Sequence, residues 1–324
     1  MSASKRENII QSIADSYIER ELFSGIEWIA EKSGKVVLSG KSGYQNFEEK
    51  TPIPTSAIYR IYSMTKPITS VMALKLIEEG KLRLYDLVSS FIPSFENLKV
   101  MNPDGSTEDL ERPIIIEDLL THRSGLTYDF LPGCHVAPLY SEKDISDDGS
   151  VNLEEKCESL SRLPLAYQPG SRFNYSVSID VLARIIEVIS EKDFEEILKE
   201  EIFEPLDMKD TGFSVKEKNL PRLMSTYGAA NFKEIMNVGP HSLKETDVNQ
   251  HNPYLKGNHF RRGGTGLFST TYDYLSFARM LLTGKSKSGK IILSRNMIKF
   301  MRVNRIPDTP VSYTHLTLPT IYSV

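Results

Sequence analysis

Long apolar runs, repeats of fixed period and clusters of like charge are all missing from this chain of 324 residues. Because it has no basic stripe and a formal net charge of only -4, we expect it to bind neither nucleic acid nor an anionic lipid surface. The N-terminus, residues 1–22, alternates charged and apolar residues instead of placing an uninterrupted apolar segment after a basic one. The sequence therefore predicts no membrane span, no secretory signal and a cytoplasmic location.

Cysteine is also scarce. Cys134 and Cys157 lie far apart in the sequence and belong to no Cys-x-x-Cys or Cys/His cluster. This spacing matches neither a zinc-binding nor a redox motif. We therefore expect two buried or incidental thiols, and we predict neither a metal site nor a cofactor.

The composition that remains is that of a globular protein with a core, with 40% hydrophobic and 25% charged residues. Apolar residues recur at three- and four-residue steps over residues 9–18, which predicts an amphipathic helix, and residues 26–39 resemble a β-hairpin. A short β-prone segment precedes Ser63. Helical spacing resumes after it and is expected to end at Gly80.

Beyond residue 80 the pattern becomes one of short helical segments joined by polar loops that contain proline and glycine. Helical faces are expected over residues 179–189 and 194–202, and Thr270 or Thr271 is expected to cap a late helix.

These patterns predict an α/β fold in which helices flank an antiparallel sheet, with a mostly helical second lobe. Residues 1–80 and 259–311 would form the α/β lobe, and residues 81–258 the helical lobe. A chain of this length is long enough for two such lobes, with a cleft between them.

Ser63 and Lys66 are the first candidates for chemistry. Serine is a poor nucleophile at neutral pH and needs a base within hydrogen-bond reach. If Ser63 opens the predicted helix, Lys66 lies on the same face about one turn further on. Ser-x-x-Lys is weak by itself, because Ser2 and Lys5 match it equally well. Only Lys66 enters an apolar run, where burial disfavours its charge and lowers its pKa, so only Lys66 is expected to serve as a base.

Tyr175 is the next candidate. It follows the turn-forming stretch at residues 167–171 and precedes a predicted helix, so its side chain can point into a cleft. A phenol titrates near pH 10 and becomes a useful proton carrier beside a cation such as the Lys66 ammonium. Judged alone, with 15 tyrosines in the chain, a packed loop tyrosine is the simpler interpretation.

Several blocks of sequence occur in one characteristic order between Ile26 and about Leu282. They are Ser63-Met64-Thr65-Lys66-Pro67; Leu119-Leu120-Thr121-His122-Arg123-Ser124-Gly125-Leu126; Tyr167-Gln168-Pro169-Gly170 with Tyr175-Ser176; residues 202–208 with 211–213; and residues 263–267 with Ser269, Thr270 and Asp273. Together they resemble the class C β-lactamase-like family of the β-lactamase and penicillin-binding-protein superfamily.

The resemblance implies a serine hydrolase that acts through a covalent acyl-enzyme. Ser63 would form the ester, Lys66 would accept or relay its proton, and Tyr175 would act as general base and then protonate the leaving group. Which of the two takes the proton first stays open. The backbone N–H of Ser63 would be one oxyanion donor. No metal or organic cofactor is implied.

One departure from the family bears on the substrate. Its β-lactamases usually carry an asparagine two residues after the tyrosine, where it holds the substrate's amide, and this chain has Val177. The difference favours the family VIII carboxylesterases and a small ester substrate. A β-lactamase or D-alanyl-D-alanine carboxypeptidase acting on amides, including β-lactams, and a non-catalytic relative remain as alternatives. The sequence indicates no oligomeric state.

A second departure concerns the C-terminus. The family's third motif, Lys-Thr-Gly or His/Trp-x-Gly, supplies the second oxyanion N–H, and nothing after Leu282 matches it. Residues 312–324, rich in Thr, Tyr and Pro, are predicted to be a non-native tail on a C-terminally truncated chain. Losing one oxyanion donor lowers turnover by about 10² to 10³, so we expect weak activity.

Two further interpretations rank lower. His122, Ser63 and Asp118 could form a His/Ser/Asp triad, although the lysine already offers a base. Gly263, Gly264 and Gly266 could cradle a phosphate, but a tight turn into a helix explains them more simply.

Overall fold

The structure is a computed structural model, and it describes residues 3–143, 145, 150–228, 243–245 and 261–306. The α-helices are α1 (Ala3–Glu19), α2 (Thr65–Glu78), α3 (Ile116–Leu120), α4 (Ala137–Glu142), α5 (Leu153–Leu160), α6 (Ser178–Ser190), α7 (Phe194–Leu198), α8 (Thr271–Thr283) and α9 (Arg295–Met301). The strands are β1 (Gly25–Lys32), β2 (Lys35–Asn46), β3 (Thr51–Pro52), β4 (Ile58–Arg60), β5 (Lys99–Met101), β6 (Thr107–Asp109), β7 (Tyr227–Gly228), β8 (Lys244–Glu245) and β9 (Phe268–Thr270). Short 3-10 turns are η1 (Tyr62–Met64), η2 (Val88–Ser90), η3 (Pro93–Phe95) and η5 (Glu217–Arg222), and η4 (Lys199–Phe203) is a π-helical turn.

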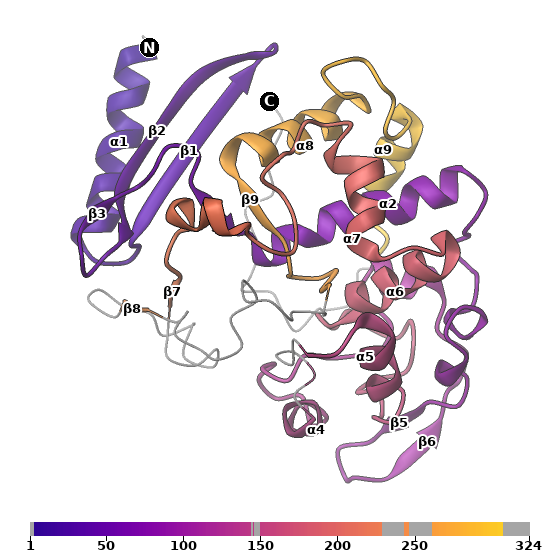
Figure 1. Cartoon of the computed structure of the whole chain (residues 1–324). Helices are drawn as coiled ribbons and strands as arrows, with labels where there is room; N and C mark the ends of the chain where they lie inside the picture. Colours follow the sequence, from indigo (N-terminus) through magenta and orange to yellow (C-terminus); the bar gives the residue numbers. More distant parts are fainter. Residues whose placement is uncertain (1–2, 144, 146–149, 229–242, 246–260, 307–324) are drawn as a thin grey trace.

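The predicted N-terminal helix and hairpin are both present and form one side of the molecule (Figure 1). Strand β1 pairs antiparallel with β2, and β2 pairs with β3. Opposite Trp28 on β1 stands Gly40 on β2, where a Cβ atom would lie 2.3 Å from the indole ring. The absence of a side chain at residue 40 therefore leaves room for the indole ring of Trp28.

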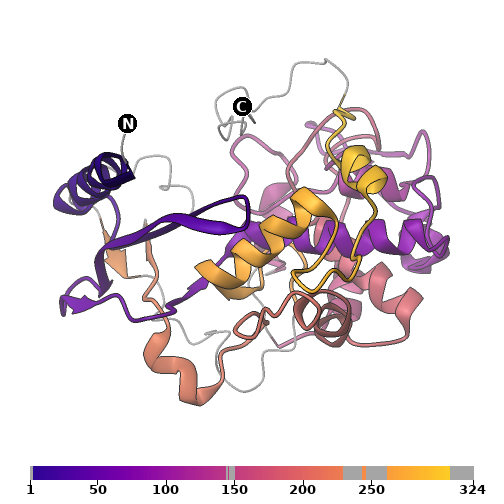
Figure 2. The same cartoon turned by 90° about the horizontal axis from the view of Figure 1, so that it is seen from above.

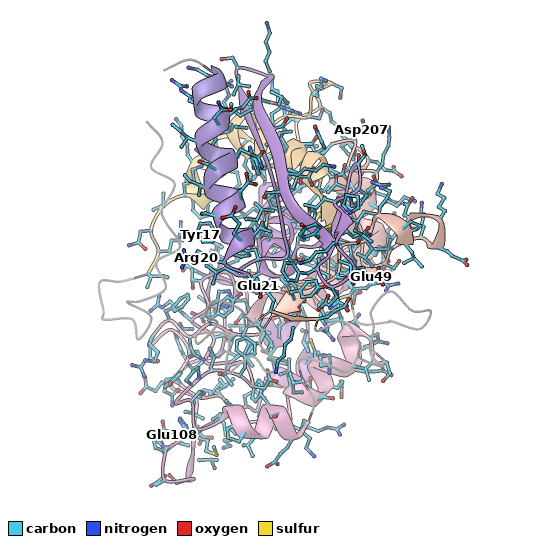
Figure 3. The ribbon with its side chains drawn as sticks, turned by 90° about the vertical axis from the view of Figure 1, so that its left-hand side faces the viewer. Tyr17, Arg20, Glu21, Glu49, Glu108 and Asp207 are labelled. Carbon is cyan, nitrogen blue, oxygen red and sulfur yellow. The ribbon has the colours of Figure 1, made fainter. Side chains whose placement is uncertain are left out.

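Helices cover this sheet on both sides of the hairpin. Helix α1 packs against β2, and α8 packs against β1, where Arg279 Nε donates to Glu31 Oε1 at 2.9 Å. Figure 3 shows α1 from its outer side, with Tyr17 on its last turn and Arg20 directly after the helix; the Arg20 guanidinium lies 6.0 Å from the centroid of the Tyr17 ring. The arrangement confirms the predicted fold class of an antiparallel sheet flanked by helices.

Helix α2 runs through the middle of the molecule, as the view from above shows (Figure 2). Its sequence is apolar on almost every side, and Ile68, Val71, Met72 and Leu76 are all buried. A helix that is hydrophobic all round needs neighbours all round. On one side α2 packs against α6, which in turn contacts α3, α5 and α7.

A second, two-stranded sheet joins distant parts of the chain in front of α2. Strand β4 pairs antiparallel with β9, with Ile58 opposite Thr270 and Arg60 opposite Phe268. This pairing brings the residues just before Ser63 next to those just after Gly264, so two segments that are far apart in the sequence meet at one place.

The predicted helix boundaries hold closely. Gly80, with φ of +74°, follows the end of α2, and the Thr270 hydroxyl caps α8 by accepting the N–H of Asp273 at 3.1 Å. Cys134 and Cys157 are free and buried, as expected. The helix α9 was not predicted.

The division into lobes stays a prediction, and its boundary at residue 258 lies outside the described residues, as does the tail at 312–324. Among the residues that are described, every helix is too short or too polar to cross a membrane.

Candidate active site

Ser63 lies in the turn that connects β4 to α2. The residue before it, Tyr62, has φ of +40°, a backbone conformation that L side chains rarely adopt. Two hydrogen bonds fix the turn: Ile61 N–H donates to Leu267 O at 3.0 Å, and Met64 N–H donates to Ile61 O at 2.9 Å. Ser63 thus belongs to η1 and not to α2 itself, and its exposed side chain stands at the mouth of the helix.

The structure brings together the three residues that the sequence singled out. Ser63 Oγ lies 2.6 Å from the hydroxyl of Tyr175 and 3.2 Å from Nζ of Lys66. Lys66 is in the first turn of α2, and Tyr175 is in the loop before α6. The Ser63 hydroxyl, the candidate nucleophile, therefore has two groups within hydrogen-bond reach that can transfer a proton. The catalytic roles of all three residues stay a prediction.

Lys66 is held in a nearly closed environment. Besides Ser63, its Nζ donates to the carbonyl oxygen of Gly264 at 2.9 Å and to the Tyr128 hydroxyl at 3.2 Å. The side chain is buried, and burial lowers the Lys66 pKa to about 8, although the charge of Asp180 acts in the opposite direction. At neutral pH a useful fraction of the amine is therefore uncharged and able to accept a proton.

Tyr175 is partly buried next to Lys66. Lys66 Nζ lies 4.5 Å from the centroid of its ring, yet the pKa of Tyr175 is raised, chiefly by burial, while the hydrogen bond with Ser63 lowers it and the charge of Asp180 raises it. Burial therefore outweighs the hydrogen bond with Ser63 in setting the pKa of the phenol. The phenol thus stays protonated at neutral pH and is suited to donate a proton.

His122 does not form the triad that was considered. Its ring packs against Tyr175, with centroids 4.9 Å apart, and its Nδ1 lies 3.3 Å from Ser176 Oγ. Burial, reinforced by the charge of Lys66, lowers the His122 pKa to about 3, so the ring is neutral. The proposed third member, Asp118, is bonded elsewhere.

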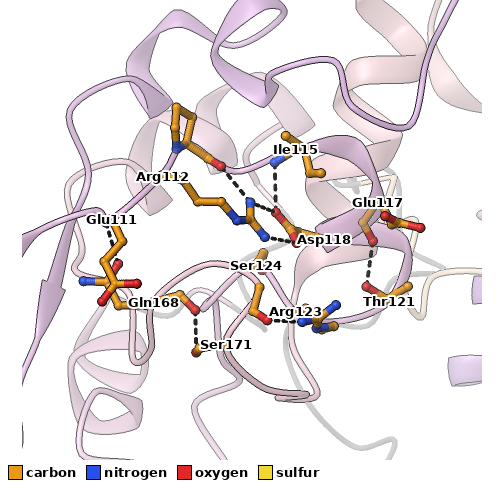
Figure 4. A network of polar contacts seen from close by, with 12 residues as sticks. Glu111, Arg112, Ile115, Glu117, Asp118, Thr121, Arg123, Ser124, Gln168 and Ser171 are labelled. Carbon is orange, nitrogen blue, oxygen red and sulfur yellow. Dashed lines mark hydrogen bonds and ion pairs between the residues drawn. The ribbon is translucent and has the colours of Figure 1, made fainter. Parts of the chain in front are cut away.

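The carboxylate of Asp118 is fully engaged by Arg112, as the close view shows (Figure 4). Arg112 Nη1 and Nη2 donate to the two oxygens at 2.7 and 2.8 Å, and Ile115 N–H donates to Oδ2 at 3.0 Å. Asp118 therefore anchors the start of α3 and does not orient a catalytic histidine.

The glycine-rich segment holds side chains of α2, and so the phosphate-cradle alternative is not supported. Gly263 O accepts from Thr69 Oγ1 at 2.7 Å, and Gly264 O accepts from Lys66. A Cβ atom on Gly263 would lie 2.6 Å from the Cβ of Ala183 on α6. The glycines thus allow the backbone to pass between two helices closely enough for its carbonyl oxygens to reach α2.

Val177 stands where the β-lactamases of the resembling family carry an asparagine, and its side chain is buried. Val177 is 3% exposed and packs in the main core at the start of α6. The nearby amide of Asn174 is also turned inward, because its Nδ2 donates to Leu126 O at 2.8 Å. Neither side chain presents an amide to a substrate.

Two residues of the site, Tyr128 and Asp180, were missed by the sequence reasoning, as was the contact of Gly264 with Lys66. Asp180 is almost completely buried in the first turn of α6, among apolar neighbours. A lone acidic residue on an otherwise apolar helix face, five positions after Tyr175, was a usable signal. For Tyr128, one of 15 tyrosines, nothing in the sequence marks it out.

An apolar hollow of about 510 Å³ lies beside the nucleophile turn. Met64, next to Ser63 in the chain, lines it together with Trp28, Ile61 and Leu275. Tyr274 also lines the hollow, and its hydroxyl donates to Met64 O at 3.0 Å. Apolar surface is therefore available close to Ser63.

Comparison with known proteins identifies the class to which this fold belongs, a hydrolase family of β-lactamase fold. The chain belongs to the Beta-lactamase family, which it matches over residues 10–313. Protein Rv1367c of Mycobacterium tuberculosis is 32% identical over 306 residues, which are 92% of this chain and 72% of that protein. Esterase EstB of Burkholderia gladioli is 29% identical over 207 residues, or 63% of this chain and 50% of that protein. Among solved structures, EstCE1, described as a hydrolase with promiscuous acyltransferase activity, has a TM-score of 0.72 and 26% identity, covering 91% of this chain and 75% of that one.

Proposed function

We propose that this protein is a serine esterase that cleaves small carboxylic esters through an acyl-Ser63 intermediate. One observation carries the proposal: the Ser63 hydroxyl has the Tyr175 phenol at 2.6 Å and the buried Lys66 amine at 3.2 Å. Serine becomes a nucleophile when a base takes its proton as it attacks, and the amine is the group whose pKa lies close to working pH.

In the acylation step, the proton of the Ser63 hydroxyl passes to the neutral amine of Lys66. Ser63 Oγ forms a bond to the ester carbonyl carbon, and the carbonyl oxygen becomes an oxyanion opposite the backbone N–H of Ser63. When the oxyanion collapses, the bond to the alcohol oxygen breaks and the Tyr175 phenol protonates that oxygen. The step leaves a phenolate next to the Lys66 ammonium, and these opposite charges stabilise each other.

In the deacylation step, a water molecule attacks the acyl carbon and gives its proton to the Tyr175 phenolate. The bond to Ser63 Oγ then breaks, and the Lys66 ammonium returns its proton to that oxygen. The acid leaves and all three residues regain their starting protonation states. Both groups are used as acid and as base within one cycle, which requires no cofactor in either step.

An ester is favoured over an amide by the site and by the relatives. Val177 packs in the core at the position where an asparagine would hold a substrate amide. Among the relatives, EstB is named as an esterase and EstCE1 is described as a hydrolase. An ester is also easier to cleave than an amide, because its alcohol is a better leaving group than an amine.

The test is to treat the protein with a fluorophosphonate and, separately, with a labelled penicillin, and to locate each adduct by mass spectrometry. We expect the fluorophosphonate on Ser63, a burst of p-nitrophenol from p-nitrophenyl butyrate, and little or no penicillin adduct. Ser63→Ala should lose both the adduct and the burst.

A matched control uses the other Ser-x-x-Lys copy, because Ser2→Ala should leave the labelling unchanged. A fluorophosphonate adduct on another serine would disprove the assignment of the nucleophile. Rapid, stable penicillin acylation of Ser63 would instead favour the penicillin-binding alternative.

A further inference from the structure

A buried carboxylate stands behind the Lys66 amine. Asp180 is 5% exposed, and its Oδ1 accepts the backbone N–H of Gly264 at 2.9 Å. The carbonyl oxygen of the same residue accepts from Lys66 Nζ at 2.9 Å. Gly264 is therefore bonded on its N–H side to Asp180 and on its C=O side to Lys66.

The space around Gly264 is filled on the sides of Asp180 and Tyr128. A Cβ atom there would lie 3.1 Å from Asp180 Oδ2 and 3.2 Å from the Tyr128 hydroxyl, which is itself bonded to Lys66. The carboxylate, the glycine and the tyrosine thus pack in contact around the amine. Small movements of the carboxylate would be passed to the carbonyl oxygen that holds Nζ.

Charge also couples the side chains of Asp180 and Lys66. A buried carboxylate needs positive or hydrogen-bonding partners, and a buried amine needs negative ones. The charged and titratable groups that face Asp180 from the surrounding elements are Lys66, Arg262, Lys156, Cys157, Tyr128 and Tyr175. Those that face Lys66 are Asp180, His122, Tyr128 and Tyr175.

A helix start alone does not explain Asp180. Acidic residues are common in the first turn of helices, where the helix dipole favours them. Asp273 occupies the same third position in α8, and its Oδ2 accepts from the N–H of Asp210 at 2.8 Å and from Thr211 Oγ1 at 2.9 Å. Asp273 thus occupies an equivalent helix position but binds a loop, at Asp210 and Thr211. Asp180 instead binds Gly264, and Gly264 in turn accepts the hydrogen bond from Lys66.

We infer that Asp180 is a positioning residue for Lys66: its carboxylate fixes residue 264, whose carbonyl oxygen holds the amine next to the Ser63 hydroxyl, and its charge faces that amine. The inference rests on the proposed role of Lys66 as the base. In the working enzyme Asp180 keeps Nζ directed at Ser63 and favours the ammonium that forms when the serine gives up its proton. It touches neither substrate nor Ser63.

The experiment measures the rate of fluorophosphonate labelling at Ser63 between pH 5 and 10. The labelling rate should rise with pH as Lys66 loses its proton. Asp180→Asn keeps an oxygen for the N–H of Gly264 but removes the negative charge, so Lys66 should lose its proton more easily. We expect the midpoint of the rise to move to lower pH by about one unit. Asp273→Asn should keep the wild-type midpoint, and an Asp180→Asn midpoint identical to wild type would overturn the inference.

A second measurement does not depend on activity. In urea unfolding, Asp180→Asn should lower the midpoint of the wild type, because the amine loses its counter-charge. In a Lys66→Met background the same change should lower the midpoint less or raise it, because the carboxylate has then already lost the positive charge of Lys66 as a partner. Equal effects in both backgrounds would contradict the inference.

The remaining outcomes are also decisive. If Asp180→Asn fails to fold alone but folds together with Lys66→Met, the coupling is supported; if both fail to fold, Asp180 has a structural role independent of Lys66. If the wild type does not label at Ser63, the proposed function fails, and the urea experiment still decides whether Asp180 acts on Lys66.

Discussion

The hydroxyl oxygens of Ser63 and Tyr175 lie 2.6 Å apart, although 112 residues separate them in the sequence. The two side chains come from different parts of the fold, one from the turn before α2 and the other from the loop before α6, and the packing of α2 against α6 brings them together. Each can give or take a proton, so the chemistry of either residue depends on the other and on Lys66.

Removing the amine should abolish most of the activity. We expect Lys66→Met to lower kcat/KM for p-nitrophenyl butyrate by about 10² to 10⁴ while the circular dichroism spectrum stays native. Lys75→Met is the matched control, because Lys75 is on the same helix but pairs with Glu79 at 2.7 Å. Activity retained in Lys66→Met would show that another group takes the proton.

The wild-type activity should increase with pH. Lys66 is a base only when it is neutral, and its pKa is lowered to about 8 by burial. The rate should therefore be low at pH 6, rise through pH 8 and level off above it. Steady-state kcat/KM across this range, with the stability of the protein checked at each pH, provides the measurement. A rate that falls as the pH rises through 8 would contradict this role.

Tyr175→Phe separates proton donation from packing. The ring stays against Lys66 and His122, and only the hydroxyl is lost. Because the phenol is proposed to protonate the leaving alcohol, the loss should be about 10² or more for an ethyl ester, and clearly smaller for a p-nitrophenyl ester, whose leaving group needs no proton. Tyr85→Phe, at a side chain that is 68% exposed, should change neither rate. Equal losses with both esters would argue against leaving-group protonation.

His122 should make the protein sensitive to acid. Its pKa is about 3 in the folded protein against 6.5 for an ordinary histidine, so the unfolded chain binds more protons between these values. The contribution of His122 to stability is then fully present above pH 6.5 and is lost as the pH falls, by about 1.4 kcal/mol per pH unit. His122→Asn removes the titrating ring and suits the φ of +53° at this position. Urea unfolding between pH 4 and 6 should therefore show a weaker pH dependence in the variant; the same slope in both proteins would exclude this role.

Asp118 should matter for folding and not for chemistry. Its side chain is 3% exposed and is bonded at both oxygens by Arg112, so Asp118→Ala should destabilise the protein by about 3 kcal/mol. The labelling rate of Ser63 per folded molecule should not change. A folded Asp118→Ala protein that no longer labels would revive the His/Ser/Asp triad.

Much of the fold could be predicted because the signals were local. Helical spacing gave α1, α2, α6 and α8, and the Ser33-Gly34 turn between apolar segments gave the hairpin. The residues 63, 66 and 175 could be selected because short motifs surround them. The sequence did not show that residues 58–60 pair with 268–270, because a three-residue strand carries no register information until its partner is known.

The environment of the amine could not be predicted for a related reason. The pKa of Lys66 depends on its burial, which lowers it, and on the charge of Asp180, which raises it. Both effects involve residues that are distant from Lys66 in the sequence. The expectation that Tyr175 lies beside Lys66 and carries protons there used the right pair of residues. It did not include burial, which is the main cause that raises the pKa of the phenol.

The contact between Lys66 and the Gly264 carbonyl spans 198 residues. During synthesis, the serine and the amine emerge from the ribosome long before the oxygen that orients them. A chain that ends before residue 264 would therefore carry Ser63 and Lys66 but lack the carbonyl oxygen that holds the Lys66 amine.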